Sequence, residues 1–397
     1  MTKELSLAVP HENKAHIASL DGFRGLAISL VLINHLLWSN SQTGSRVLNA
    51  ICAMRAAGWV GVDLFFALSG FLITGILFDT LNSNHYLRNF YTRRALRIFP
   101  LYYGVVLVLF AALYLRGFKQ MHPVYLLLVY LQNTPLWWTY KGAPFISSTM
   151  SYLWSLAVEE QFYLVWPLLV FFIRGRRRLM WTALILAALA PISRWFLLAH
   201  GASFASTYEL TICRADSLLG GAWLALAVRG RLRDQVVRFA PPFLLLAFVV
   251  CVAIGLRSGS FDWEQSRDVN LYGYSFVAVG SVSLIAMSLR SGSMTASVMQ
   301  FGVLRFLGKY SYGIYVYHQL INIFIEGYLS KVLHAHIESK ILFHLVYMIV
   351  ALLAIIPTAV LSFHFYEQPF LRLKKYFSYS DRRTSAASHP SAQSLEA

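Results

Sequence analysis

The sequence has few charged residues. Of its 397 residues, 13% are Asp, Glu, Lys or Arg and 57% are hydrophobic, whereas soluble domains carry about 25% charged residues. This scarcity excludes a single water-soluble core for the whole chain, because such a core cannot hide so much apolar surface. We therefore expect a polytopic membrane protein whose apolar surface faces lipid.

Cysteines and several well-known catalytic motifs are also scarce or missing. The three cysteines are too few and too scattered for a disulfide framework or a metal site; they are Cys52, Cys213 and Cys251. The chain has no G-x-S-x-G elbow, no P-loop and no H-E-x-x-H motif. The first nineteen residues have no uninterrupted apolar stretch, so no cleaved signal peptide is expected. Any chemistry must rest on other residues.

Ten apolar stretches are long enough to cross a hydrocarbon layer of roughly 30 Å. They lie at about residues 20–38, 57–78, 99–116, 152–173, 180–199, 212–228, 241–256, 272–289, 309–328 and 341–366. Segment 123–132 is too short to span and is expected to form a re-entrant or interfacial helix. We predict an all-α bundle of about ten transmembrane helices in a domain at 16–370. A cytoplasmic segment at 1–15 and a largely disordered cytoplasmic tail at 371–397 would flank this domain.

Basic residues are distributed unequally between the two sides of these spans. With a cytoplasmic N-terminus, 22 of the 34 Lys and Arg residues fall on the cytoplasmic side, nine outside and three within spans. The positive-inside rule requires such an asymmetry, so both termini are predicted to be cytoplasmic. The same distribution accounts for the net charge of +16 without a nucleic-acid partner.

Ionisable residues inside spans are costly and therefore mark candidate functional sites. The first span contains Asp21, Arg24 and His35. Asp21 and Arg24 share a helix face and are expected to pair, while His35 lies about 16 Å further along the same helix and faces the same interior. In the structural alternative, the pair anchors the helix and His35 bonds to a neighbouring helix. The residues alone leave both readings open.

The fourth span adds two adjacent acidic residues, Glu159 and Glu160, which point about 100° apart on a helix. Only one is expected to face the interior, where His35 would be a suitable partner. A histidine held by a carboxylate removes a proton from an attacking hydroxyl and returns it to the leaving group. The alternative is a glutamate that closes a structural polar network.

Other polar residues of the spans allow both a functional and a structural reading. Arg94 and Arg97 share a helix face, and they either grip phosphates or anchor the third span as snorkelling side chains. Asp63 and the Ser69–Gly70 break lie in the second span, where helix packing is an equal explanation. The remaining candidates are each more often structural when taken alone; they are Arg214, Asp216, His318, Glu326 and Glu367.

Taken together, these segments resemble the membrane-bound acyltransferase family 3, which includes bacterial O-antigen and peptidoglycan O-acetylases. The resemblance covers about residues 16–370 and rests on an ordered set of segments: LDGFRGLAISLVLINH, GVDLFFALSGFLI, RRALRIFPLYY, WSLAVEEQFYLVWP, RADSLLGG, LGKYSYGIYVYH and FYEQP. The most specific family feature is an arginine followed after ten residues by a histidine, which Arg24 and His35 supply. Arg94-x-x-Arg97 matches a second motif, and the fourth-span segment selects Glu159 as the family's acidic position.

The resemblance implies an acyl-CoA-dependent O-acyltransferase in a bacterial inner membrane. The donor, expected to be acetyl-CoA, would enter from the cytoplasm as a co-substrate, with no bound cofactor and no metal. His35 would be the general base, oriented or charge-balanced by Glu159. Donor and substrate would be held by a larger set of residues, namely Asp21, Arg24, Asp63, Ser69, Arg94, Arg97, Arg214 and His318.

The acceptor implied by the resemblance is a hydroxyl of a glycan, a lipid-linked sugar or a small glycosylated molecule. The chain departs from two-domain relatives, because an extracytoplasmic SGNH-type esterase domain is missing from these residues. This departure argues against a large polymer acceptor that needs a second transfer, and it leaves open a smaller or lipid-linked acceptor or an antibiotic-like metabolite. The rival class is a transporter or flippase for a glycan or lipid-linked precursor, which also directs charged residues into a polar cavity. Transporters often show inverted repeats, and none is found here.

Overall fold

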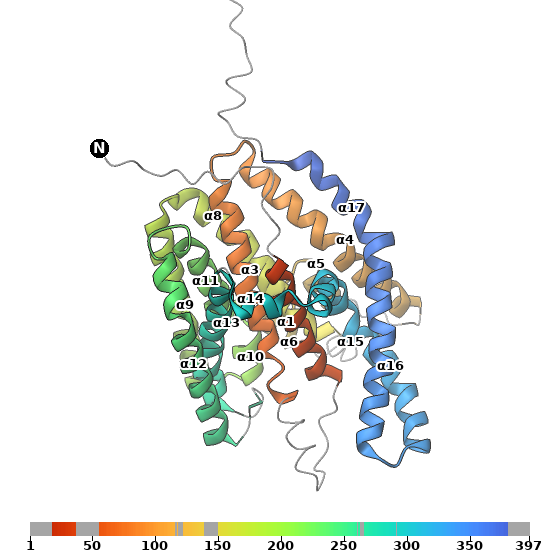
Figure 1. Cartoon of the computed structure of the whole chain (residues 1–397). Helices are drawn as coiled ribbons and strands as arrows, with labels where there is room; N and C mark the ends of the chain where they lie inside the picture. The colour runs from red at the N-terminus through yellow and green to blue at the C-terminus, as the bar shows by residue number, and fades with distance from the viewer. Residues whose placement is uncertain are drawn as a thin grey trace, which may run out of the picture.

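The computed structural model describes residues 18–36, 55–115, 117, 122–138, 150–259, 261–262, 266–290 and 292–379. Every regular element in this part of the chain is a helix (Figure 1), which confirms the predicted all-α membrane bundle. Eight stretches of the described residues are long and apolar enough to cross a membrane. The other two predicted spans are also helical, as α1 (Ala18–Leu36) and α15 (Gly302–His336). The count of ten spans and their orientation stay predictions.

The eight stretches correspond to single helices or to helices in direct succession. They are α3 (Val60–Asp79), α4 (Tyr86–Leu115), η1 with α8 (Ser151–Leu153, Trp154–Ile173), α9 (Arg176–Ala199), α10 with α11 (Phe204–Glu209, Thr211–Ala227), α12 (Arg233–Ser258), η2 with α13 (Val269–Gly273, Tyr274–Ser288) and α16 with η3, α17 and η4 (Lys340–Ser362, Phe363–Glu367, Gln368–Arg372, Leu373–Phe377). Three short helices complete the set: α5 (His122–Leu128), α6 (Pro135–Trp138) and α14 (Met294–Met299). Helix α5 occupies the segment that was predicted to be too short to span.

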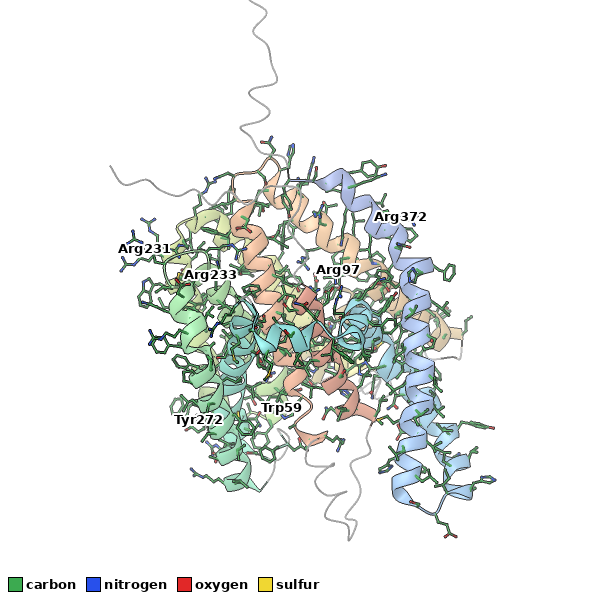
Figure 2. The ribbon with its side chains drawn as sticks, in the orientation of Figure 1. Trp59, Arg97, Arg231, Arg233, Tyr272 and Arg372 are labelled. Atoms are coloured by element: carbon green, nitrogen blue, oxygen red, sulfur yellow. The ribbon has the colours of Figure 1, made fainter. Side chains whose placement is uncertain are left out.

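Two groups of helices flank a central pair. In Figure 1, α9, α11, α12 and α13 lie on one side, α4, α15, α16 and α17 lie on the other, and α1 and α3 lie between them. Arg97, Arg231, Arg233 and Arg372 are found in the upper half of the molecule in Figure 2, whereas Trp59 and Tyr272 are in the lower half. The labelled arginines thus gather toward one end of the bundle, as a positive-inside orientation requires.

Glycines bring the central helices into direct backbone contact. A Cβ atom added to Gly308 of α15 would lie 1.8 Å from the carbonyl oxygen of Asp21 in α1, and one added to Gly70 of α3 would lie 1.8 Å from that of Leu218 in α11. Small residues permit such close packing between transmembrane helices. The break at Ser69–Gly70 therefore has a packing role, and α1 is held tightly against α15.

Two boundaries differ from the sequence prediction. Helix α4 begins at Tyr86 and runs for 30 residues, so Arg94 and Arg97 lie within a long helix instead of before a short span. The predicted tail at 371–397 is ordered at its start, because η4 packs on α4 and the Arg93 guanidinium donates to the carbonyl of Lys374 at 2.9 Å. Residues 1–15 and 380–397 lie outside the described part of the chain.

Candidate active site

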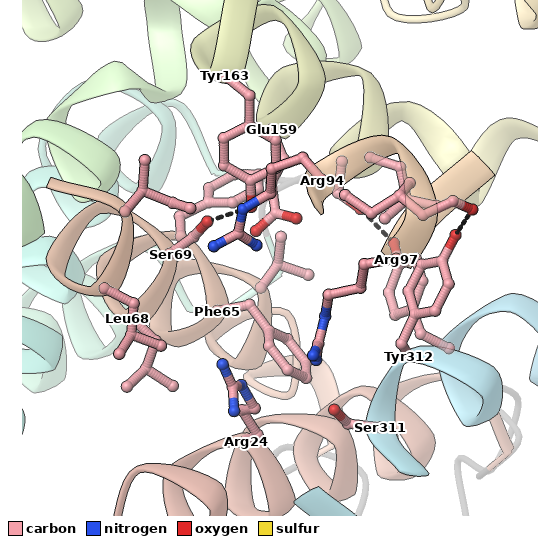
Figure 3. Close-up of a pocket in the computed structure, with 18 residues that line it drawn as sticks. Arg24, Phe65, Leu68, Ser69, Arg94, Arg97, Glu159, Tyr163, Ser311 and Tyr312 are labelled. Atoms are coloured by element: carbon pink, nitrogen blue, oxygen red, sulfur yellow. Dashed lines mark hydrogen bonds between the residues drawn. The ribbon is translucent and has the colours of Figure 1, made fainter. Parts of the chain in front are cut away.

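A cavity lies between α1, α3, α4, α8 and α15, and it collects most of the predicted donor-binding residues. Arg24 of α1 and Arg94 and Arg97 of α4 line it. Figure 3 shows their guanidinium groups directed into the same space, with Phe65 of α3 between them. We call this the arginine cavity. The predicted Ser69 and Glu159 also line it.

Helical periodicity explains why these side chains converge. Arg94 and Arg97 are three residues apart on α4 and therefore share a face. Ser155, Glu159 and Tyr163 repeat every four residues on α8, and all three line the arginine cavity. On α1, the Arg24 guanidinium donates to the Asp21 carboxylate at 2.8 Å, which confirms the predicted pair and fixes the direction of the arginine.

A second cavity adjoins the first and shares Arg24, Arg97 and Tyr312 with it. The π-helical segment η3 carries Glu367 into this second cavity, which also contains Lys309 and Lys374. Together, five basic side chains and three acidic side chains line the two cavities. Their acidic members are Asp21, Glu159 and Glu367. The combined site therefore favours an anionic ligand.

Arg94 and Arg97 are available for such a ligand. Among the described residues, neither arginine forms an ion pair within 4.0 Å, whereas Arg24 is held by Asp21. Arg94 instead places its guanidinium over the Tyr163 ring, 5.3 Å from the centroid. A snorkelling anchor would direct these groups to the membrane surface. Their place in an interior cavity favours the phosphate-binding reading of the sequence.

Glu159 belongs to the arginine cavity rather than to His35. It lines this cavity beside Ser69 and Tyr163, whose hydroxyl groups are hydrogen-bonded to each other, and it lies within electrostatic range of Arg94. No hydrogen bond or ion pair joins it to His35 in the described residues. The reason is depth, because Glu159 lies at the level of Arg24, and His35 is about 16 Å of helix rise beyond Arg24. The predicted contact between Glu159 and His35 is therefore not observed.

A second histidine packs against the His35 ring. His35 is half-buried, and its ring centroid lies 5.0 Å from that of His318 on α15. His318 is fully buried and packs edge-on against the ring of Tyr152, 5.2 Å away. The sequence predicted His318 for donor or substrate binding, and the structure brings it to the predicted general base.

Tyr315 connects the histidine pair to the arginine cavity. Its side chain lines the cavity, and its backbone carbonyl accepts a hydrogen bond from Nδ1 of His318 at 2.6 Å. Its hydroxyl donates to the carbonyl of Tyr152 at 2.7 Å and accepts from the Ser155 hydroxyl. Tyr315 thus contacts both the arginine cavity and the histidine pair.

Asp63 and Arg214 lie apart from this arrangement. They form a fully buried ion pair at 2.6 Å, and Ser217 donates a further hydrogen bond to Asp63. Four aromatic rings surround the Arg214 guanidinium, the nearest being Tyr274 at 4.2 Å. Neither residue lines the arginine cavity. Their surroundings indicate a structural link between α3 and α11 rather than the predicted ligand contact.

Sequence reasoning missed several cavity residues that α8 and α15 contribute. Tyr163 follows Glu159 by one turn, and Ser311, Tyr312 and Tyr315 precede His318 on α15. A search for polar residues one helical turn from each predicted residue would have found them, because side chains at i and i+4 share a face. The described residues contain no group of three or more His, Cys, Asp or Glu side chains that could hold a metal ion.

Comparison with known proteins gives a consistent result. The chain is 31% identical to the peptidoglycan O-acetyltransferase OatA of Listeria monocytogenes over 77% of this chain and 49% of that protein. It is 29% identical to the putative peptidoglycan O-acetyltransferase YrhL of Bacillus subtilis over 94% of this chain and 58% of that protein. An O-acetyltransferase OatA of Staphylococcus aureus is 25% identical, over 97% of this chain and 62% of that protein.

The chain therefore spans about half to three-fifths of the length of these relatives. No solved structure matches it. A family model described as an acyltransferase domain matches residues 17–367, which include all the residues that line the arginine cavity and the histidine pair. The chain belongs to this family, acyltransferase family 3.

Proposed function

We propose that this protein is an acetyl-CoA-dependent O-acetyltransferase that modifies a glycan hydroxyl at the plasma membrane. The observation that carries the proposal is the separation of two sites on one helix. Arg24 lies in the arginine cavity, and His35 lies about 16 Å further along α1. A donor that uses both sites has its phosphates far from its acyl group, with a slender uncharged arm between them, as acyl-CoA has.

In this proposal the arginine cavity holds the phosphates of the donor. Arg24, Arg94 and Arg97 offer forked donors that match phosphate oxygens. The adjoining cavity extends the basic surface through Lys309 and Lys374. The Glu159 carboxylate partly neutralises the positive charge of the arginine cavity and so affects donor binding. Glu159→Gln should therefore change the KM for the donor more than kcat.

His35 acts on the acceptor. Its Nδ1–H donates to the carbonyl of Val31 at 3.0 Å, which leaves the Nε2 lone pair as a base. The acceptor hydroxyl attacks the thioester carbonyl carbon as its proton moves to this nitrogen. The new C–O bond forms, the C–S bond breaks, and the sulfur leaves with one proton as free thiol.

The glycan acceptor is inferred from the functions of the relatives. OatA of Listeria monocytogenes is a peptidoglycan O-acetyltransferase, and this chain covers only part of that protein. With the basic end of the bundle in the cytoplasm, His35 lies toward the opposite face. An acceptor on the outer side would then reach the base while the donor stays inside.

The test uses purified protein in lipid vesicles with acetyl-CoA and glycan strands. Thiol release and acetylation of the glycan, measured by mass spectrometry, should appear together. His35→Ala should lower both by about 10²- to 10⁴-fold. His200→Ala is the matched control, because His200 is exposed and donates to the carbonyl four residues earlier in the same way, at 2.8 Å. Movement of glycan across the vesicle membrane without thiol release would overturn the proposal in favour of a transporter.

A further inference from the structure

We propose that His318 is the proton-relay partner of His35. In this role it takes the proton that His35 removes from the acceptor hydroxyl and passes it toward the leaving sulfur. The inference rests on the proposed acyl transfer and adds a residue to it. Its basis is the juxtaposition of two imidazole rings from α1 and α15, with centroids 5.0 Å apart and planes inclined by 57°.

Hydrogen bonds to the backbone determine which nitrogen of each ring carries a lone pair. Nδ1 of His35 lies 3.0 Å from the Val31 carbonyl oxygen, and Nδ1 of His318 lies 2.6 Å from the Tyr315 carbonyl oxygen. A carbonyl oxygen only accepts, so both Nδ1 atoms must carry hydrogen. Each neutral ring therefore presents an unprotonated Nε2. The two Nε2 atoms are not hydrogen-bonded to each other in this structure, so one proton passes between them as N–H···N when the rings turn toward each other. Two added protons would repel each other in this interior.

The Nε2 atom of His318 is poised to receive a proton. It is buried and has no hydrogen-bond partner in the part of the chain that the structure describes. Buried polar groups are normally satisfied, and each exception needs an explanation. A proton that arrives during each turnover explains this exception, because it gives Nε2 of His318 a transient hydrogen-bond partner. A purely structural histidine would gain more from a permanent donor.

The surroundings of the two rings give the relay a direction. The Arg55 guanidinium donates to the carbonyl of Asn34, next to His35, at 3.0 Å, and its charge opposes a positive charge on the His35 ring. His318 is hydrogen-bonded to Tyr315, which lines the arginine cavity, whereas the backbone partner of His35, Val31, does not line it. The proton thus moves from the acceptor side to the side where the sulfur leaves.

The step balances with one proton and no other reagent. The acceptor O–H bond breaks as the C–O bond forms, and the proton binds Nε2 of His35. It then moves to Nε2 of His318 and finally to the sulfur whose C–S bond has broken. Both imidazoles end neutral, as they began, and the products are an ester and a thiol.

The test compares His318→Gln with wild type in lipid vesicles. Glutamine keeps a donor for the Tyr315 carbonyl and an acceptor beside His35, but it cannot take up a proton. We expect about a 100-fold lower kcat with an unchanged KM for acetyl-CoA. The double variant with His35→Ala should be no slower than His35→Ala alone, since the two residues act as a unit. His200→Gln, at an exposed position, is the control for the substitution itself.

Several outcomes would overturn the relay. A His318→Gln enzyme with wild-type kcat would do so, as would losses that multiply in the double variant. If the variant fails to fold, His318→Asn replaces it, since asparagine also cannot take up a proton. A folded His318→Asn enzyme with wild-type kcat refutes the relay. A wild-type protein that neither releases thiol nor acetylates glycan refutes the proposed function, whereas the outcomes above refute the relay alone.

Discussion

Replacing Arg97 by lysine tests the phosphate-binding role most directly, because Arg97 lines both cavities. Lysine keeps the positive charge and the hydrophobic stem, so membrane anchoring is preserved. It cannot, however, reproduce the planar fork that binds two phosphate oxygens at once. A hydrogen bond to a charged group contributes about 1.5–3 kcal/mol, and 1.4 kcal/mol is tenfold in affinity. Loss of one such bond should raise the KM for acetyl-CoA about 10- to 100-fold.

The assay measures thiol release against acetyl-CoA concentration for wild type and Arg97→Lys. Saturating donor should restore most of the rate, because the arginine acts in binding rather than in the chemical step. Arg178→Lys is the matched control, since Arg178 is exposed at the start of α9 and lies outside both cavities. A stable, correctly inserted Arg97→Lys protein with wild-type donor KM would refute the reasoning and return Arg97 to an anchoring role.

Three further predictions follow from the packing and the charge distribution. Asp63→Ala should lower the free energy of unfolding by about 3–5 kcal/mol, because Arg214 would be left buried without its partner. Thermal denaturation in detergent measures this change, and an unchanged stability would contradict the structural role. Gly308→Ala should destabilise the protein because its Cβ would meet the Asp21 carbonyl, whereas Gly327→Ala on the same helix meets nothing within 4 Å and should be neutral or stabilising by up to about 1 kcal/mol. Reporter fusions after residues 178 and 238 should be cytoplasmic and one near 262 should be outside; a cytoplasmic signal at 262 would overturn the topology.

The fold was largely predictable because lipid imposes a strong constraint on composition. A span needs about 20 apolar residues, so the long helices can be recognised even where their ends shift. The start of α4 at Tyr86 was missed, because Arg93, Arg94 and Arg97 make its first turns as polar as a loop. The hydropathy of a segment depends on what surrounds its side chains. A helix whose charged side chains line a cavity therefore lacks the high hydropathy expected of a membrane span.

The site was predictable where two residues lie on one helix, and much less so where they lie on two. The Asp21–Arg24 pair and the shared face of Arg94 and Arg97 follow from the helical repeat. The partner of His35 does not, because it depends on the register between α1 and another helix. Glu159 was the chemically reasonable choice, but the close contact at Gly308 sets α15 against α1 and brings His318 to the histidine instead.

The placement of Arg24 and His35 on one helix has a consequence for the donor. Because α1 is a single continuous helix over Ala18–Leu36, the distance between Arg24 and His35 along this helix is fixed by helical rise. In the proposed mechanism an acyl phosphate would not serve as donor, because its anionic group lies beside the reacting carbonyl and could not bind the arginines while that carbonyl reaches His35. Substitutions at the arginines should therefore change donor affinity, and substitutions at the histidines should change the rate at saturation. A transporter breaks no bond near the histidines. Substitutions at the arginines and at the histidines would therefore not divide into effects on affinity and effects on the rate at saturation.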